Sequence, residues 1–308
     1  MKQVKVFAPA TVANINCGYD VLGFAVENPG DEVVAKLIDE PKVIIKNIFG
    51  DEGKLPLDAK KNTAGVAVKS FLEHIKTNNG VELELHKKMP LGSGLGSSAA
   101  SAVASVFAAN SLFGKPFSKR ELLQFAMDAE KVACGSAHAD NVAPSLLGGF
   151  VIIRSYNPLD IIKIKTPKLF ATIIHSEIVI RTEDARNILD RTVQLNKVVK
   201  QCGNLAGLIT GMFTEDYNLI SRSLKDEIIE SQRSKLIPNF YDVKKGALQS
   251  GALGCGISGS GPSIFALSKD KKTAEKIGKE MQKIFSLRKI NCEVYISKIN
   301  NEGVRVIK

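Results

Sequence analysis

Residues 89–101 read MPLGSGLGSSAAS, a stretch without charged side chains whose composition suits a phosphate-binding loop. Gly92, Gly94 and Gly96 allow the backbone to turn tightly and to approach an anion with no Cβ in the way. Two serines at 97 and 98 add hydroxyl groups that suit phosphate oxygens or a metal ion. The alternative is an ordinary glycine-rich turn that leads into a helix, and the stretch alone leaves both interpretations open.

The predicted elements on either side favour phosphate binding. VELELHKK (81–88) alternates apolar and polar residues as a half-buried strand does, and AASAVASVFAANSLF (99–113) has the small-residue composition of a helix. A loop between a strand and a helix presents unpaired N–H groups and the positive helix end to an anion. An uncharged loop can therefore bind a polyanion through its aligned peptide dipoles.

Two familiar nucleotide-binding motifs do not fit the chain. The Walker pattern needs a lysine where this sequence has Ser97 or Ser98. The dinucleotide pattern G-x-G-x-x-G occurs at 254–259, but it leads into a predicted strand and not into the helix that dinucleotide binding requires. The chain therefore lacks the lysine of the first motif and the helix that must follow the second.

Glu130 is a candidate functional carboxylate. A helix is predicted from Ser118, with Glu121 completing a capping box. On this helix Leu122, Ala126 and Glu130 follow one another at i, i+4 spacing, so the carboxylate ends an otherwise apolar stripe. A buried carboxylate needs a cation or hydrogen bonds. The pattern leaves open whether that cation is a metal ion or a lysine or arginine in an internal ion pair.

Hydrophobic periodicity predicts mixed α and β structure without internal repeats. In the first half we expect strands at 4–8 and 81–85, apolar runs around 32–38 and 42–48, a helix at about 62–75, and a strand that runs into a turn at 148–158. In the second half we expect strands at 169–175, 263–267 and 292–297, helices at about 182–191, 192–213, 239–250 and 271–285, and a glycine-rich turn at 254–261. The order of these elements favours an α+β chain over a doubly wound sheet. The length favours two domains, with a boundary near 156–158.

Composition restricts the location of the protein. Its 308 residues are 44% apolar and 24% charged, as in a globular protein. The N-terminal residues contain no signal-peptide core, and no run of about 18 apolar residues occurs, so we expect a cytoplasmic protein without membrane contact. Five widely separated cysteines without a C-x-x-C pair indicate reduced thiols.

The formal net charge of +10 admits a nucleic-acid-binding function or a lysine-rich solvated surface. Lysines occur in scattered pairs, tryptophan is absent from the sequence, and aromatic residues do not alternate with basic ones. We therefore expect no nucleic-acid partner. A positive surface would also attract an anionic ligand such as ATP.

Three motifs, in order along the chain, resemble those of the GHMP kinases, a family that includes galactokinase, homoserine kinase and mevalonate kinase. PATVAN (9–14) resembles the first motif, PLGSGLGSSAA (90–100) the second and GISGSGPS (256–263) the third. HADNVAPSLLGGF (138–150) and KLIPNF (235–240) are most similar to the homoserine kinases within this family.

One position departs from the homoserine kinase pattern. Those kinases usually have A-N-L-G-x-G-F-D where this chain has ANINCGYD (13–20), so Asn16 replaces a glycine. Asparagine is the next best residue at positive φ, and we expect the loop to keep its shape.

The resemblance implies an α+β, two-domain GHMP kinase fold. It consists of a ribosomal protein S5 domain 2-like N-terminal domain (1–157) and a C-terminal ferredoxin-like α/β sandwich (158–308). ATP and Mg²⁺ are the implied cofactors, with Ser98 and Glu130 as the implied metal ligands. The implied ATP-binding residues are Asn62, Lys87, Pro90, Leu91, Gly92, Ser93, Gly94, Leu95, Gly96, Ser97 and Ser98.

The resemblance to the homoserine kinases implies that phosphate passes from ATP to the hydroxyl of L-homoserine, giving O-phospho-L-homoserine for threonine biosynthesis. Such a zwitterion needs an arginine fork for its carboxylate and an acid for its ammonium. The resemblance assigns Arg186 and Arg233 to the carboxylate and Asp20 to the ammonium. The implied substrate-binding residues are Asn14, Asp20, His138, Thr182, Arg186, Arg233 and Gly259.

Asn141, Asp140 and Arg186 are the implied catalytic residues. Asp140 aligns with the aspartate that mevalonate-type members offer as a base, whereas we expect in-line alignment and electrostatic stabilisation to be the main terms here. Pattern alone also allows structural roles for several site residues: Arg186 as a surface charge, Thr182 as a helix N-cap, His138 as a core partner of Asp140, and Arg233 as a solvated charge.

Other functions stay open at this stage. The chain could be a kinase for another small alcohol of the mevalonate or shikimate type, or, outside this class, a basic nucleic-acid-binding protein. The resemblance also allows a homodimer.

Overall fold

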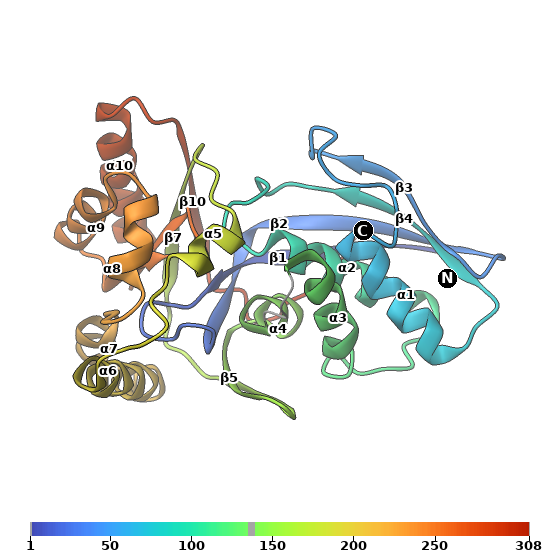
Figure 1. The fold of residues 1–308 in the computed structure, drawn as a ribbon, viewed down its shortest axis with the longest axis horizontal. Coiled ribbons are helices and arrows are strands. Elements are labelled where there is room, and N and C mark those ends of the chain that lie inside the picture. The colour runs from blue at the N-terminus through green and yellow to red at the C-terminus, as the bar shows by residue number, and fades with distance from the viewer. Residues whose placement is uncertain (1, 135–138, 308) are drawn as a thin grey trace.

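The computed structural model describes residues 2–134 and 139–307, which form two β-sheets with helices packed against each (Figure 1). The larger sheet has the order β11-β1-β2-β4-β3, and β5 and β6 extend it from β2. Its strands are β1 (Gln3–Ala13), β2 (Leu22–Ile38), β3 (Val43–Phe49), β4 (Gly80–His86), β5 (Phe150–Tyr156), β6 (Leu159–Ile164) and β11 (Arg305–Ile307). Strand β2 pairs with β1, β4 and β5 and so joins the whole sheet.

A buried helix, α2, packs against β1 and β2 of this sheet and against α1, α3 and α4. Its residues are mainly alanine, serine and valine, and nearly all of them are buried. Because the side chains are small, sheet and helices can approach α2 from every side. The helices of this layer are α1 (Thr63–Ile75), α2 (Ser97–Leu112), α3 (Leu123–Cys134) and α4 (Ala139–Leu147).

The smaller sheet is antiparallel with the order β10-β7-β9-β8. Its elements are β7 (Phe170–Ser176), α9 (Phe240–Gln249), β8 (Gly254–Ile257), β9 (Ile264–Ser268), α10 (Lys271–Leu287) and β10 (Cys292–Lys298). Numbered in chain order, its strands follow the order 4-1-3-2, with α9 and α10 in the connections, which is a ferredoxin-like arrangement. The predicted α+β class and the ferredoxin-like second half are therefore confirmed.

The second half also contains α5 (Thr182–Asn187), α6 (Leu195–Thr214), α7 (Tyr217–Ser223), α8 (Glu230–Arg233) and a 3₁₀ turn (Ser234–Leu236). Figure 1 shows α6 to α10 at one end of the molecule and α1, β3 and β4 at the other. We call the larger sheet with α1 to α4 the first lobe, and the smaller sheet with α5 to α10 the second lobe. Within the described residues, no helix is long and apolar enough to cross a membrane.

Several predicted boundaries are wrong. The helix predicted from Ser118 begins at Leu123. The predicted capping contact is present, since the Glu121 carboxylate accepts from N (2.8 Å) and Oγ (2.7 Å) of Ser118, but residues 119–122 form a turn before the helix. The predicted turn at 254–261 starts as strand β8, which pairs with β9. The helix predicted at 182–191 ends earlier, at Asn187, as α5.

The two sheets divide the chain differently from the predicted ranges 1–157 and 158–308. The predicted boundary falls in the turn between β5 and β6, which pair with each other, and β11 returns to pair with β1. An isolated bridge between Val26 and Ile299 joins β2 to the residues that follow β10. We propose that the first boundary between the lobes lies between β6 and β7.

Candidate active site

The three sequence motifs, far apart along the chain, meet in one place. Thr11 N in the first motif donates to Leu95 O in the second at 3.0 Å. The third motif contacts both: Ser258 Oγ donates to Gly94 O at 2.7 Å, and Gly259 N donates to Ala13 O at 3.2 Å. The motifs therefore build one site, to which both lobes contribute.

The glycine-rich loop has the backbone shape that close approach to an anion requires. Gly94 and Gly96 have φ angles of 74° and 67°, and a Cβ on them would lie 2.5 Å from Ser258 O and 2.2 Å from Thr11 Oγ1. Gly96 precedes α2, and no side chain caps the start of this helix. The first N–H groups of α2 therefore have no competing side-chain acceptor at the cap position.

Lys87, a predicted ATP contact, is bound beneath the loop, with its side chain 2% exposed. Its ammonium pairs with Asp31 and donates to Ser97 O (2.9 Å) and Ser101 Oγ (2.6 Å). Asp31 also accepts from Ser97 Oγ at 3.0 Å and from Lys88 N at 2.8 Å. These contacts hold the start of α2 on β2, while an ATP contact of Lys87 stays a prediction.

A cleft of ≈ 400 Å³ opens above the loop. Of the predicted site residues, the following line it: Asn14, Asp20, Asn62, Lys87, Leu91, Gly92, Ser93, Gly94, Gly96, Ser97, Ser98, Glu130, Asp140, Asn141, Thr182, Arg186, Arg233 and Gly259. Pro90 and Leu95 are not part of its wall, and Leu95 is fully buried in the core. His138 lies outside the described residues.

Sequence reasoning missed part of the wall: Leu55, Pro56, Lys61, Thr63, Ser101 and Ser260. The first four lie next to Asn62, which caps α1 by accepting from Ala64 N (3.0 Å) and also donates to Pro56 O (2.9 Å). Asn62 thus shapes this wall through the backbone. The irregular stretch before α1 contains no motif, and the lysine pair at 60–61 is its only sequence signal.

Glu130 lies on α3 in the floor of the cleft and is 3% exposed. Burial raises the pKa of Glu130 to about 7, against the opposing effects of a hydrogen bond with Ser98 and the charge of Lys87. Its Oε1 accepts no hydrogen bond from any residue that the structure describes. A buried carboxylate with an unused oxygen beside a serine hydroxyl has the chemistry of a Mg²⁺ site that borrows its other ligands from phosphate and water.

Helix α4 carries Asp140 and Asn141 into the cleft. Asn141 Oδ1 accepts from Thr11 Oγ1 at 2.8 Å, which fixes the orientation of the amide. Burial, followed by the negative charge of Asp20, raises the pKa of Asp140 to about 7. Oδ1 of Asp140 has no hydrogen-bond donor in the described part of the chain. Asp140 is therefore a carboxyl that can change its protonation state near neutral pH.

Asp20 and Arg186 form an ion pair across the cleft. Nη2 of Arg186 lies 3.2 Å from both carboxylate oxygens of Asp20, and the Arg186 side chain is 35% exposed. Tyr156 Oη donates to Asp20 O at 3.0 Å, which holds the backbone of this residue. Thr182 is the first residue of α5 and not its N-cap, which is Arg181, so the capping alternative for Thr182 is wrong.

Arg233 is 4% exposed, so its interpretation as a solvated surface charge is wrong. Its Nε donates to Ala185 O at 3.0 Å and its Nη1 to Gly259 O at 2.8 Å. The guanidinium carbon lies 4.9 Å from the ring centre of Tyr19. Burial lowers the pKa of Arg233, and the neighbouring Tyr19 and Asp20 oppose this effect. The cleft thus has an N–H-rich end at the uncharged glycine-rich loop and an end with two arginines and two aspartates.

Comparison with known families identifies the class of protein that has this arrangement. The model for the GHMP kinases N terminal domain matches residues 62–149, and the model for the GHMP kinases C terminal matches residues 199–287. The chain belongs to the GHMP kinase family. As a kinase of this family it takes its phosphate from ATP.

Several relatives match over their full length. The homoserine kinase of Chlorobaculum tepidum is 51% identical over 320 residues, which cover 100% of this chain and 99% of that protein. The homoserine kinase of Xylella fastidiosa is 36% identical, covering 99% of this chain and 94% of that protein.

Solved structures agree with this family membership. The homoserine kinase of Cytophaga hutchinsonii has a TM-score of 0.98 and 56% identity, covering 100% of this chain and 98% of that chain. The mevalonate kinase of L. major in complex with R-mevalonate has a TM-score of 0.76 at 14% identity, covering 96% of each chain, and so shares the fold.

The raised pKa values of Glu130 and Asp140 predict a pH dependence of stability. Both titrate near pH 7 in the folded protein but near the ordinary values of 4.5 and 3.8 in the unfolded chain, so the folded state binds more protons between these values. The unfolding free energy should therefore fall as pH rises toward about 7 and then level off. Glu130→Gln or Asp140→Asn should remove a cost on the order of 3 kcal/mol at high pH and less at low pH.

Urea unfolding at a series of pH values, with ligand-free protein, measures this dependence. Asp128→Asn is a matched control on α3, because this side chain is half exposed and bonds Ser70 Oγ outside the cleft. A stability difference between wild type and the Glu130 or Asp140 variants that stays constant with pH would contradict the raised pKa values.

Proposed function

We propose that this GHMP kinase is a homoserine kinase, which transfers the γ-phosphate of ATP to the hydroxyl of L-homoserine and forms O-phospho-L-homoserine for threonine biosynthesis. The observation that carries the proposal is full-length similarity to proteins named homoserine kinase, including a solved structure at 56% identity and a TM-score of 0.98. The two chemically distinct ends of the cleft support it further.

The N–H-rich end suits the phosphates of ATP. Residues 90–98, the start of α2, Asn62 and Lys87 are the proposed nucleotide contacts, and the helix dipole favours a polyanion there. The loop adds no charged side chain of its own. Its contribution to transfer is a fixed set of dipoles that need no reorganisation as negative charge shifts between oxygens.

Glu130 and Ser98 are the proposed ligands of Mg²⁺. The unpartnered Oε1 of Glu130 and the adjacent Ser98 hydroxyl fit an ion that takes few protein ligands. When bound, Mg²⁺ would neutralise charge on the β- and γ-phosphate oxygens. The residues themselves must supply an ionised carboxylate, so Glu130 has to lose its proton for the site to form.

The charged end suits a zwitterionic acceptor. In the proposed complex the substrate carboxylate pairs with Arg186 and Arg233, and its ammonium pairs with Asp20. Asn14, Thr182 and Gly259 supply polar walls, and His138 stays a predicted contact. The 3.2 Å ion pair of Asp20 and Arg186 would exchange for two pairs with the substrate, so no charge is left without a partner.

Asp140 and Asn141 are proposed to act on the acceptor hydroxyl. Asp140, with its pKa raised to about 7, can accept the hydroxyl proton as the new bond to phosphorus forms. Asn141 is held by Thr11 and can orient the hydroxyl but not take its proton. A loose transition state gains little from a general base, so we attribute most of the rate enhancement to alignment and electrostatic stabilisation.

A cytoplasmic location, the absence of a nucleic-acid partner and an allowed homodimer stay predictions.

Homoserine should be the preferred acceptor in a panel with mevalonate, shikimate and galactose, because galactose lacks both charges, and mevalonate and shikimate have a carboxylate but lack the ammonium. The measurement is ADP release with each alcohol at saturating Mg²⁺ and ATP. Turnover with mevalonate, shikimate or galactose but not with homoserine would exclude the proposed function. ATP-independent, salt-sensitive binding of polynucleotide without turnover would favour the nucleic-acid alternative.

Glu130→Gln should keep the fold but lose Mg²⁺-dependent turnover, because the amide is nearly isosteric but uncharged. In the wild type, binding of Mg²⁺ and ATP should release protons near pH 7, since the Glu130 pKa is about 7 in the ligand-free protein. Calorimetry in two buffers of different ionisation enthalpy measures this release. Asp128→Asn should behave as wild type, and unchanged turnover of Glu130→Gln at ordinary Mg²⁺ would assign Glu130 a structural role.

Arg233→Ala should raise the KM for homoserine strongly and leave the KM for ATP nearly unchanged, since loss of one partner of a desolvated pair costs about 2–5 kcal/mol. Arg233→Lys should recover part of the loss, because an ammonium cannot reproduce the bidentate fork. The exposed Arg181, paired with Asp184 at the start of α5, supplies the control Arg181→Ala. Equal effects of Arg233→Ala on both KM values would indicate a structural defect instead of a carboxylate contact.

A further inference from the structure

The loop between β1 and β2 (14–20) carries two residues of the charged end, Asn14 and Asp20, and its backbone is strained. Asn14, Ile15, Asn16 and Asp20 have φ angles of 74°, 40°, 57° and 55°. Asparagine and aspartate tolerate this region, whereas for the β-branched Ile15 it costs roughly 1–2 kcal/mol. Contacts from outside the loop must therefore hold it in shape.

Asn16 makes such a contact with the second lobe. Its side chain is buried, and Nδ2 donates to Leu224 O at 2.9 Å and to Cys255 O at 3.1 Å. Leu224 is the C-cap residue that follows α7, and Cys255 lies in β8. One amide group of the first lobe thus bonds two segments of the second lobe that are far apart in sequence.

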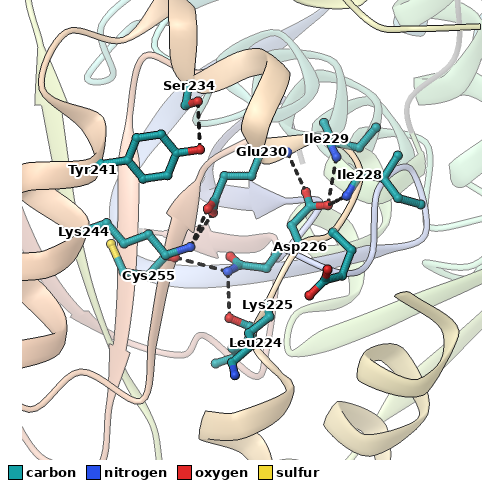
Figure 2. A network of polar contacts seen from close by, with 12 residues as sticks. Leu224, Lys225, Asp226, Ile228, Ile229, Glu230, Ser234, Tyr241, Lys244 and Cys255 are labelled. Atoms are coloured by element: carbon teal, nitrogen blue, oxygen red, sulfur yellow. Dashed lines mark hydrogen bonds and ion pairs between the residues drawn. The ribbon is translucent and has the colours of Figure 1, made fainter. Parts of the chain in front are cut away.

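The two carbonyl oxygens that accept from this amide belong to a network of polar contacts in the second lobe. Figure 2 shows this network, which includes Leu224, Cys255, Glu230 and Lys244. Asp226 accepts from the backbone N of Ile228 (2.8 Å), Ile229 (2.9 Å) and Glu230 (3.1 Å), so it fixes the turn that starts α8. Glu230 in turn pairs with Lys244 of α9 at 2.5 Å.

The same part of the second lobe also fixes Arg233. Helix α8 begins at Glu230 and ends at Arg233, whose Nη1 donates to Gly259 O at 2.8 Å. Gly259 O also accepts from Asn14 Nδ2 at 2.8 Å. The loop 14–20 is therefore attached at Asn14 and at Asn16 to the frame that holds the second arginine of the charged end.

A glycine in the second lobe makes room for Asn16. A Cβ on Gly256 would lie 1.9 Å from Asn16 Oδ1 and 2.7 Å from its Cγ, and its three closest atoms all belong to Asn16. Oδ1 itself accepts no hydrogen bond from the residues described. A glycine, which the homoserine kinases usually have at this position, would adopt the same backbone conformation. What the Asn16 side chain adds is therefore the two hydrogen bonds that Nδ2 donates, because the backbone conformation does not require it.

We propose that Asn16 is a positioning residue that ties the loop 14–20 to the second lobe and so sets the distance between Asp20 and Arg233 before the acceptor binds. The proposal rests on the proposed function, because the acceptor must bridge these charges. Asn16 does not line the cleft, so it acts through Asp20 and Asn14. Its loss should weaken acceptor binding without changing the nucleotide end.

Asn16→Gly keeps the left-handed backbone but removes both hydrogen bonds, and it should raise the KM for homoserine about five- to thirtyfold, as expected for two buried bonds. Asn16→Asp keeps the shape but directs carboxylate oxygens at two carbonyl oxygens, and it should raise this KM at least as much. The KM for ATP should stay within about twofold in both.

Gly256→Ala supplies a second, independent test. Alone it should displace Asn16 and raise the homoserine KM, whereas in the Asn16→Gly background it should add little, because the clashing side chain is gone. Asn110→Ala is the matched control: this buried asparagine also makes two backbone bonds, to Phe117 at 2.9 Å and 3.1 Å, but lies outside the cleft. It should lower thermal stability and leave the homoserine KM unchanged.

A homoserine KM within about twofold of wild type in both Asn16 variants, with a stability loss like that of Asn110→Ala, would overturn the proposal. So would additive effects of Asn16→Gly and Gly256→Ala on this KM. A wild-type enzyme that phosphorylates a different alcohol would refute the proposed function instead, and the KM for that alcohol would then be the quantity compared among the same variants.

Discussion

The buried ion pair of Lys87 and Asp31 is the interaction on which the phosphate end of the cleft depends. Both side chains are almost fully buried, and removing one partner of such a pair typically costs about 3–5 kcal/mol. Ser97 and Ser101 use the remaining hydrogen-bonding capacity, so the pair is bonded to the first turns of α2 as well as to β2. The glycine-rich loop above needs no charged side chain of its own, because the contacts of Lys87 and Asp31 beneath it hold it in place. Its own N–H groups are left for the ligand.

The two lobes contribute unequally to the cleft. The first lobe supplies the glycine-rich loop, Glu130 and Asp140, whereas the charged end combines Asp20 from the first lobe with arginines from the second. The Gly259 carbonyl oxygen accepts from Asn14 and from Arg233, each at 2.8 Å, and so joins the two lobes at one atom. With the proposed assignment of the two ends, acceptor recognition would depend on how the lobes are held together, and nucleotide binding mainly on the first lobe.

Local signals in the sequence pointed to many of the residues that line the cleft. Glycine spacing predicted the loop and the start of α2, and i, i+4 spacing on an apolar stripe found Glu130 before its burial was known. Asp31 was missed because its partner Lys87 lies 56 residues away, and no local pattern reports a contact between strands. The predicted start of α3 was too early, because Ser118 and Glu121 form the capping contact but residues 119–122 form a turn before the helix. The capping box thus indicated that a helix follows and not where its first helical residue lies.

The charges around Asp20 explain why a zwitterion suits this cleft better than a simple anion. Asp20 already has Arg186 as a partner, and its negative charge helps to raise the pKa of Asp140. An acceptor that brought only a carboxylate would take Arg186 away and leave Asp20 close to Asp140, and two neighbouring negative charges each disfavour the ionisation of the other. An acceptor with an ammonium group replaces the lost partner of Asp20 and keeps the pKa of Asp140 from rising further. With the proposed substrate contacts, selection among acceptors would follow mainly from the charge balance of the cleft, and hydrogen bonds to the rest of the substrate would supply the remainder.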